Sequence, residues 1–170
     1  MKKTAMILLA LFGCTFLFTG CGVSSARSQE EALKVYSFHG ENDVISVENG
    51  VIVLDGKNEI CYGGNLDGNA NAFSDITAYS ATFYLNVDNE REVLMSNGVE
   101  DRTGGTVNVF GDLGKITGDI IRDSDVEQLL DHLWFELKTT DLSGQENTYQ
   151  LQLQMTEITK TAETDSQLPG

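Results

Sequence analysis

The feature that most constrains the fold of this chain is an alternation of apolar and polar residues with a period of two. It is clearest in residues 149–155, Tyr-Gln-Leu-Gln-Leu-Gln-Met, where every second residue is apolar and glutamines stand between. Successive side chains of a β-strand point to opposite faces, so this pattern predicts a strand with one buried face. Residues 79–87 and 133–137 repeat the pattern and predict two more strands.

Turn signals separate the short apolar segments. They fall at Asp55-Gly56, Gly63-Gly64, Asn97-Gly98, Gly104-Gly105 and Ser143-Gly144, in a chain with 17 glycines. This spacing is typical of a mainly β protein, and we expect an antiparallel β-sandwich or a sandwich-like barrel.

Residues 44–54 carry a hairpin signal. Two apolar segments, 44–47 and 51–54, flank Asn49-Gly50, a dipeptide that takes positive φ at both centres of a type I′ turn. The segment 51–54, Val-Ile-Val-Leu, does not alternate. We therefore predict a hairpin whose second strand is central and covered on both sides.

One segment departs from the β pattern. Ser124 and Glu127 form a capping box, and Val126, Leu129 and Leu130 recur at helical spacing. This predicts a short helix near residues 125–131, which we expect to close one open end of the sandwich.

The N-terminus has the pattern of an export signal. Met1-Lys2-Lys3 precedes an apolar run over residues 5–18, and the segment ends in Phe18-Thr19-Gly20-Cys21. The run of 14 residues is shorter than the roughly 20 that span a bilayer, which favours a signal peptide over a membrane-spanning helix. Two lysines at the start bias this end toward the cytoplasm.

This segment resembles the signal of bacterial lipoproteins, although Phe18 stands where that family usually has Leu, Val or Ile. The resemblance implies that Cys21 carries the lipid and becomes the mature N-terminus. The alternative is an ordinary secretory signal cut near Gly20, which would release the domain. We expect a signal peptide over 1–20, a flexible tether over 21–32, a folded domain over 33–158 and a disordered tail over 159–170. The protein would lie at the cell membrane, anchored by lipid and facing outside the cytoplasm.

Charge and cysteine content narrow the partners. Without Lys2 and Lys3 the mature chain keeps nine of the eleven basic residues against 26 acidic ones, a formal net charge of −17. Because a chain with this much negative charge repels nucleic acid, we expect no nucleic-acid partner. Cys61 is the one cysteine left after Cys14 and Cys21, and we expect it to be a small buried residue and not a reactive thiol.

A partial calcium pattern occurs in one loop. Asp67, Asn69 and Asn71 alternate like the start of an EF-hand loop, but Ala72 and Ala78 replace the glycine and the glutamate that the full motif needs. A looser calcium site that adds Asp75 is one interpretation, and solvated loop residues are the other. We expect no cofactor.

The sequence lacks a recognisable catalytic motif. It has two histidines, His39 and His132, and no Gly-x-Ser-x-Gly, His-Glu-x-x-His or phosphate-binding loop. Trp134 and Tyr84 are candidate binding residues, because alternation points them away from the predicted core. The alternative is that the helix or another sheet covers them.

The leading hypothesis is a lipid-anchored, noncatalytic binding or adhesion module for an unknown protein or glycan. The alternatives are a structural or accessory subunit of an envelope or export complex, and a hydrolase that uses carboxylates in a cleft.

Overall fold

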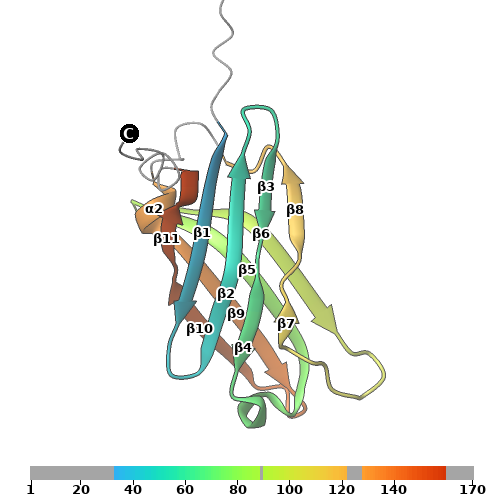
Figure 1. Cartoon of the computed structure of the whole chain (residues 1–170). Helices are drawn as coiled ribbons and strands as arrows, with labels where there is room; N and C mark the ends of the chain where they lie inside the picture. The colour runs from blue at the N-terminus through green and yellow to red at the C-terminus, as the bar shows by residue number, and fades with distance from the viewer. Residues whose placement is uncertain (1–32, 89, 122–127, 160–170) are drawn as a thin grey trace, which may run out of the picture. The chain divides into compact units, whose positions relative to one another are not determined.

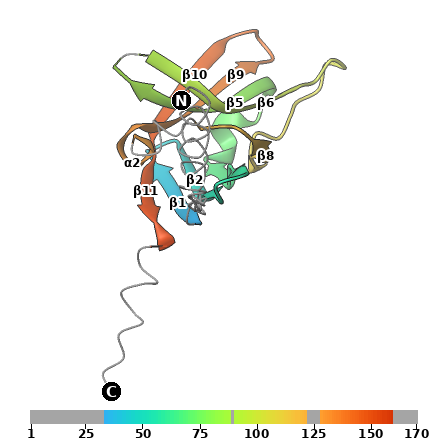
Figure 2. The same ribbon diagram turned by 90° about the horizontal axis from the view of Figure 1, so that it is seen from above.

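The described residues form two antiparallel sheets. The computed structural model describes residues 33–88, 90–121 and 128–159, and Figure 2 shows the sheets as two layers. Sheet A contains β1 (Lys34–Glu41), β2 (Ile45–Leu54), β3 (Glu59–Tyr62), β4 (Asn65–Gly68), β7 (Gly111–Asp112), β8 (Lys115–Gly118) and β11 (Gln154–Glu157). Sheet B contains β5 (Ile76–Val87), β6 (Glu90–Glu100), β9 (Leu133–Asp141) and β10 (Glu146–Gln152). The predicted β-sandwich is confirmed, and these strands do not close into a barrel.

Sheet A has the strand order β11-β1-β2-β3-β8 (Figure 1). β4 continues β3 along β2, and β7 pairs with β4. The amide of Gly63 donates to the carbonyl of Gly114 at 2.9 Å, and that of Leu113 donates to Gly64 at 2.9 Å. These hydrogen bonds continue the ladder across the break between β3 and β4 and the break between β7 and β8. The four short strands therefore form two long ones.

Sheet B has the order β10-β9-β5-β6, and β10 leads directly into β11 of sheet A. The predicted strand over 149–155 therefore divides at Leu153, where the chain passes from one sheet to the other. The Leu153 amide donates to the Leu133 carbonyl at 2.9 Å. The predicted alternation holds: Leu151 and Leu153 are buried and Met155 is half-buried, while the alternating glutamines 150, 152 and 154 are exposed.

The predicted hairpin at Asn49-Gly50 is wrong. β2 continues through both residues without a chain reversal. The register between β1 and β2 shifts at this point, and this shift marks a β-bulge. Asn49 has φ of 58°, so its left-handed backbone produces the bulge and not a turn. The reversal between β1 and β2 occurs instead beside Asn42, whose Oδ1 accepts bonds from the amides of Val44 and Ile45 at 2.9 and 3.0 Å.

β2 is central in sheet A, as expected, but it is not covered on both sides. Ile52 and Leu54 face the core, while Val51 and Val53 are half-buried on the outer face. The apolar run at 51–54 therefore places two side chains on the outer surface of the sheet.

The core lies between the sheets and centres on three rings. Phe83 packs against Phe38 and Phe135 with ring centroids 5.6 and 5.0 Å apart. Cys61 is 1% exposed, and burial raises the pKa of its thiol to about 12, which confirms it as a small buried residue.

Among the described residues, the short helices η1 (Ala70–Phe73) and α2 (Leu129–His132) accompany the sheets. α2 overlaps the end of the helix predicted near 125–131, whose capping box at Ser124 and Glu127 lies outside the described residues. Leu129 is fully buried, and α2 contacts β11 of sheet A and β5 of sheet B. The predicted leader, the tether and nearly all of the tail also lie outside the described residues. No helix within residues 33–88, 90–121 and 128–159 is long and apolar enough to cross a membrane.

Candidate functional site

The outer face of sheet B is the candidate site, and the strand register arranges its side chains in rows. Directly paired residues on neighbouring strands point to the same side of a sheet. From one end to the other, the rows are Val93, Tyr84, Trp134 and Gln152; then Ser96, Thr82, Glu136 and Gln150; then Gly98, Ser80, Lys138 and Thr148; then Glu100, Ala78, Thr140 and Glu146.

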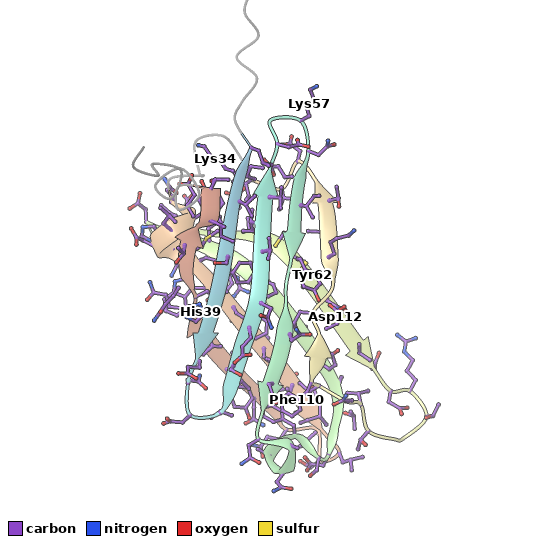
Figure 3. The ribbon with its side chains drawn as sticks, in the orientation of Figure 1. Lys34, His39, Lys57, Tyr62, Phe110 and Asp112 are labelled. Carbon is purple, nitrogen blue, oxygen red and sulfur yellow. The ribbon has the colours of Figure 1, made fainter. Side chains whose placement is uncertain are left out.

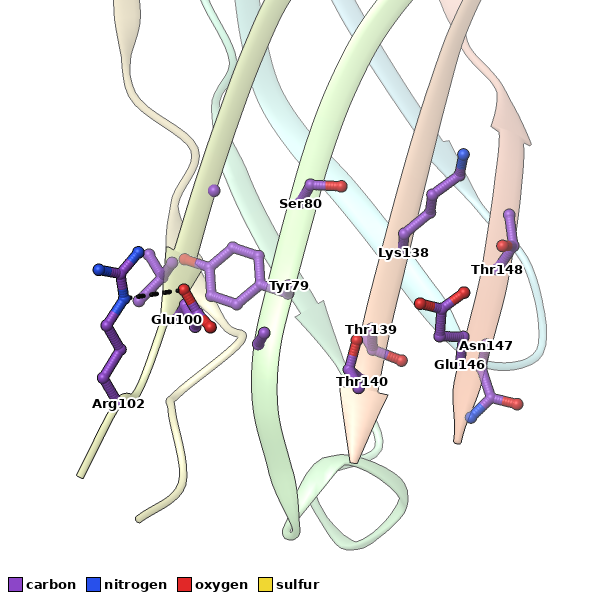
Figure 4. A pocket seen from close by; sticks show the side chains of 13 residues that line it. Tyr79, Ser80, Glu100, Arg102, Lys138, Thr139, Thr140, Glu146, Asn147 and Thr148 are labelled. Atoms are coloured by element: carbon purple, nitrogen blue, oxygen red, sulfur yellow. Dashed lines mark hydrogen bonds and ion pairs between the residues drawn. The ribbon is translucent and has the colours of Figure 1, made fainter. Parts of the chain in front are cut away.

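The last two rows form a groove of about 720 Å³ (Figure 4). Small residues line it on three neighbouring strands, Gly98 on β6, Ala78 and Ser80 on β5, and Thr140 on β9. A Cβ added at Gly98 would lie 3.8 Å from Ser80 Cβ, so a side chain there would fill part of the hollow. We call the hollow lined by these two rows, with Arg102 at one end, the groove.

The positive and negative charges of the groove lining are equal in number. Arg102 Nε lies 3.0 Å from Glu100 Oε2, and Lys138 Nζ lies 3.4 Å from Glu136 Oε1. The lining therefore has two cations, Arg102 and Lys138, and two carboxylates, Glu100 and Glu146. This balance contrasts with a chain whose formal net charge is −15.

A hydrogen-bonded network around Glu136 borders the groove. Arg91 donates to both carboxylate oxygens of Glu136 at 3.0 and 2.9 Å, and Gln150 Nε2 donates at 2.8 Å. Although Glu136 is only 5% exposed, the bonds from Arg91, aided by Gln150 and Lys138, lower its pKa from 4.5 to about 2. Because the Glu136 carboxylate is charged and accepts two hydrogen bonds from Arg91, it holds the Arg91 side chain in place. It also offers an acceptor to Lys138.

The predicted binding residues Trp134 and Tyr84 lie on this face but outside the groove. They pair directly across β9 and β5, in the row beyond Glu136. Tyr84 is 5% exposed, and the guanidinium carbon of Arg91 lies 3.8 Å from the centroid of its ring. Burial raises the pKa of the Tyr84 hydroxyl. A ligand would have to displace Arg91 to reach Tyr84, whereas Trp134 is half-buried.

The four candidate metal ligands, Asp67, Asn69, Asn71 and Asp75, lie in β4, at the start of η1, within η1 and shortly after it. Asp67 lies in β4 and accepts a bond from the Gly68 amide at 2.7 Å, while Asn69 caps η1 by accepting from the Asn71 amide at 3.1 Å. Asp75 follows η1 and receives the Leu142 amide on its backbone carbonyl. Within the described part of the chain, no group of three or more His, Cys, Asp or Glu side chains could hold a metal ion. The described bonds of Asp67 and Asn69 are to local backbone amides.

The remaining titratable candidates are dispersed. His39 pairs with Gln154 in sheet A, and His132 ends α2, both with exposed side chains. Glu100 and Glu146 stand at opposite ends of one row, three strand spacings or about 14 Å apart at Cα. Glu100 is already paired with Arg102. Cys21 lies outside the described residues.

The groove was not predicted from the sequence, because its residues are ordinary small and polar types. The available signal was the small side chain at alternate positions 78 and 80 of a predicted strand. No protein-family model, no curated protein and no solved structure matches this chain. The function is therefore derived from the geometry of this molecule.

Proposed function

We propose that this chain is a lipid-anchored, noncatalytic binding module outside the cytoplasm, and that its ligand occupies the groove of sheet B. The observation that carries the proposal is the hollow itself. The lining residues are small in the middle of the face and polar around it, while the Glu136 network keeps the adjacent row rigid. Binding sites are commonly concave, largely preformed and bordered by a few well-placed polar groups.

The position of the groove supports this role. β1 begins at one end of the sandwich, beside Lys34, and the proposed tether precedes it (Figures 1 and 3). The turn between β9 and β10 and the start of β5, which flank the groove, lie at the other end (Figure 1). A domain held through its N-terminus would thus present the groove away from the anchored end. Trp134, half-buried on the same face, remains a second proposed contact.

The outer face of sheet A favours the second candidate function, an accessory subunit of an envelope complex. Val35, Val53 and Ile60 are cross-strand neighbours there, and Val51 pairs with Tyr62 beside them. All five are half-buried and lie on the side of the sheet away from the core. An apolar row on an outer face is a surface that a partner protein could cover.

Photo-crosslinking in intact cells separates the two functions. Thr140 in the groove and Ser37 on the outer face of sheet A are each replaced by p-benzoylphenylalanine in the full-length chain. We expect an adduct from position 140 that Ser80→Trp abolishes by filling the groove, while Ser37→Trp leaves it intact. The adduct is identified by mass spectrometry.

If position 140 yields no adduct, or if its adduct persists with Ser80→Trp, the proposed function is contradicted. Crosslinks found from position 37 alone would instead favour the accessory-subunit function. Circular dichroism and thermal unfolding establish that each variant is folded.

A further inference from the structure

The chemistry of the groove indicates the class of ligand, and the first indication is the kind of group it presents. Ser80, Thr140 and Thr148 contribute hydroxyls, Glu146 a carboxylate and Lys138 an ammonium. Hydroxyls both donate and accept, the carboxylate accepts, and the ammonium keeps protons available beyond its contact with Glu136. A ligand that offers many groups able both to donate and to accept matches this lining.

The second indication is charge. Two cations and two carboxylates line the groove, and Arg102 and Lys138 each face a carboxylate already. Nucleic acids and acidic polymers need an excess of positive charge, which neither the groove nor the chain provides. A lining with balanced charges therefore favours a ligand that is uncharged over the length that lies in the groove.

The third indication is the place of the groove in the sheet. It crosses β5 and β9, which are paired on both sides, so their backbone groups are used in the ladders. A peptide cannot add as a strand there, because strand addition needs a free sheet edge. Val99 is the only aliphatic side chain larger than alanine in the described lining.

We infer that the groove binds an uncharged, polyhydroxylated chain, a neutral oligosaccharide, that lies across the strands between Glu100 and Glu146. The inference rests on the proposed function and names its ligand class. The three strand spacings between these residues, about 14 Å, give room for several linked sugar rings. The hydroxyls of Ser80, Thr140 and Thr148 and the carboxylate of Glu146 bond to the sugar hydroxyls. Lys138 donates to ring or hydroxyl oxygens.

The test measures binding of the full-length chain in detergent micelles to soluble neutral polysaccharides by biolayer interferometry. The probes are an α-glucan, a β-glucan, a xylan, a galactan and a mannan, with a polyuronic acid as the charged comparison. We expect at least one neutral polysaccharide to bind, and its Kd to change less than about twofold between ionic strengths of about 0.02 and about 0.5 M.

Variants locate the binding. Ser80→Trp should weaken it at least about tenfold, and Ser37→Trp, on the opposite sheet, less than about twofold. Thr140→Val and Glu146→Gln keep the shape of the groove and should each weaken binding by about three- to tenfold, the loss expected for one hydrogen bond. These two variants keep the test valid if Ser80→Trp fails to fold.

The other outcomes separate the two proposals. If no neutral polysaccharide binds while position 140 still gives an adduct that Ser80→Trp abolishes, the ligand class is wrong and the proposed function stands. If both experiments fail, both proposals are wrong. Binding that survives Ser80→Trp, or that prefers the polyuronic acid and weakens with salt, overturns the neutral-glycan inference.

Discussion

Glu136 shows how a single residue can be charged and nearly buried on the outer face of a single sheet. Its carboxylate accepts bonds from Arg91 and Gln150, and Lys138 lies 3.4 Å away. Arg91 in turn lies over the ring of Tyr84. The side chains cover one another, so the face carries a rigid polar layer where the sequence suggested an aromatic surface.

This network predicts how stability changes with pH. The pKa of Glu136 is about 2 in the folded protein and 4.5 as its ordinary value, so its stabilisation is present above pH 4.5 and is lost as the pH falls toward 2. Because the Arg91 side chain is 37% exposed, solvent screening limits the gain to about 1–2 kcal/mol. Urea unfolding at about pH 7 and about pH 3 should show Glu136→Gln less stable than the wild type at the higher pH, with a smaller gap at the lower pH. A gap that does not depend on pH would contradict this account.

Two buried threonines of sheet B predict opposite effects of the same substitution. Thr139 is 2% exposed, and its Oγ1 has no hydrogen-bond partner among the described residues. Thr82 is 8% exposed, and its hydroxyl lies 3.0 Å from Ser96 Oγ. Thr139→Val should leave stability unchanged or raise it by about 1 kcal/mol, whereas Thr82→Val should lower it by about 1 kcal/mol. Equal losses in urea unfolding would show that Thr139 is hydrogen-bonded in solution.

At the scale of the element, β2 shows why the strongest local turn signal did not make a turn. Asn49 supplies the positive φ, but Gly50 is needed for a contact, since a Cβ at Gly50 would lie 2.0 Å from the ring of Phe38 on the paired strand. The bulge thus lets the aromatic ring lie directly over the backbone. Positive φ was predicted for both residues of the dipeptide but occurs at Asn49 alone, and the need for glycine at position 50 comes from a residue of β1.

Gly50→Ala is predicted to destabilise the protein by about 2–3 kcal/mol, because Phe38 has to leave its place in the core. Gly98→Ala is the matched control in another strand. Its new Cβ would approach no atom closer than 3.3 Å, so the expected loss is below about 1 kcal/mol. Thermal and urea unfolding measure both, and similar losses would show that the Phe38 contact does not explain the glycine.

At the scale of the whole molecule, the two flanks of the sandwich differ. β10 and β11 are consecutive, so the chain itself joins the sheets on one flank. On the other flank, β6 and β8 are the edge strands of their sheets. Val99 of β6 is 42% exposed, although its cross-strand neighbour Tyr79 contacts the core. Ile116 of β8 is 38% exposed, although its neighbour Cys61 lies in the core. Glu90, Glu100 and a register shift in β6 are features that discourage pairing of an open edge with another chain.

The proposed anchor also belongs to this scale, because it would decide where in the cell the groove lies. We predict that Cys21→Ser moves the protein from the membrane fraction to the soluble exported fraction. A diacylated cysteine supplies two chains, which hold a protein stably, while a single chain gives marginal binding. Intact-mass measurement of the membrane-extracted wild type should show the lipid. Recovery of an unmodified wild-type chain in the medium would contradict the lipoprotein assignment.

The sequence by itself determined the strands at residues 79–87, 133–137 and 149–155 and which side of each is buried. Leu151, Phe83 and Phe135 are buried because alternation is a local consequence of strand geometry. Only the tertiary structure decided that the strand at 149–155 changes sheets at Leu153, that Asn49-Gly50 forms a bulge, and that Gly98, Ser80 and Thr140 share a hollow. The physical reason is that these features depend on strand register. Register joins residues far apart in the chain, and no local pattern encodes which rows of side chains lie next to each other.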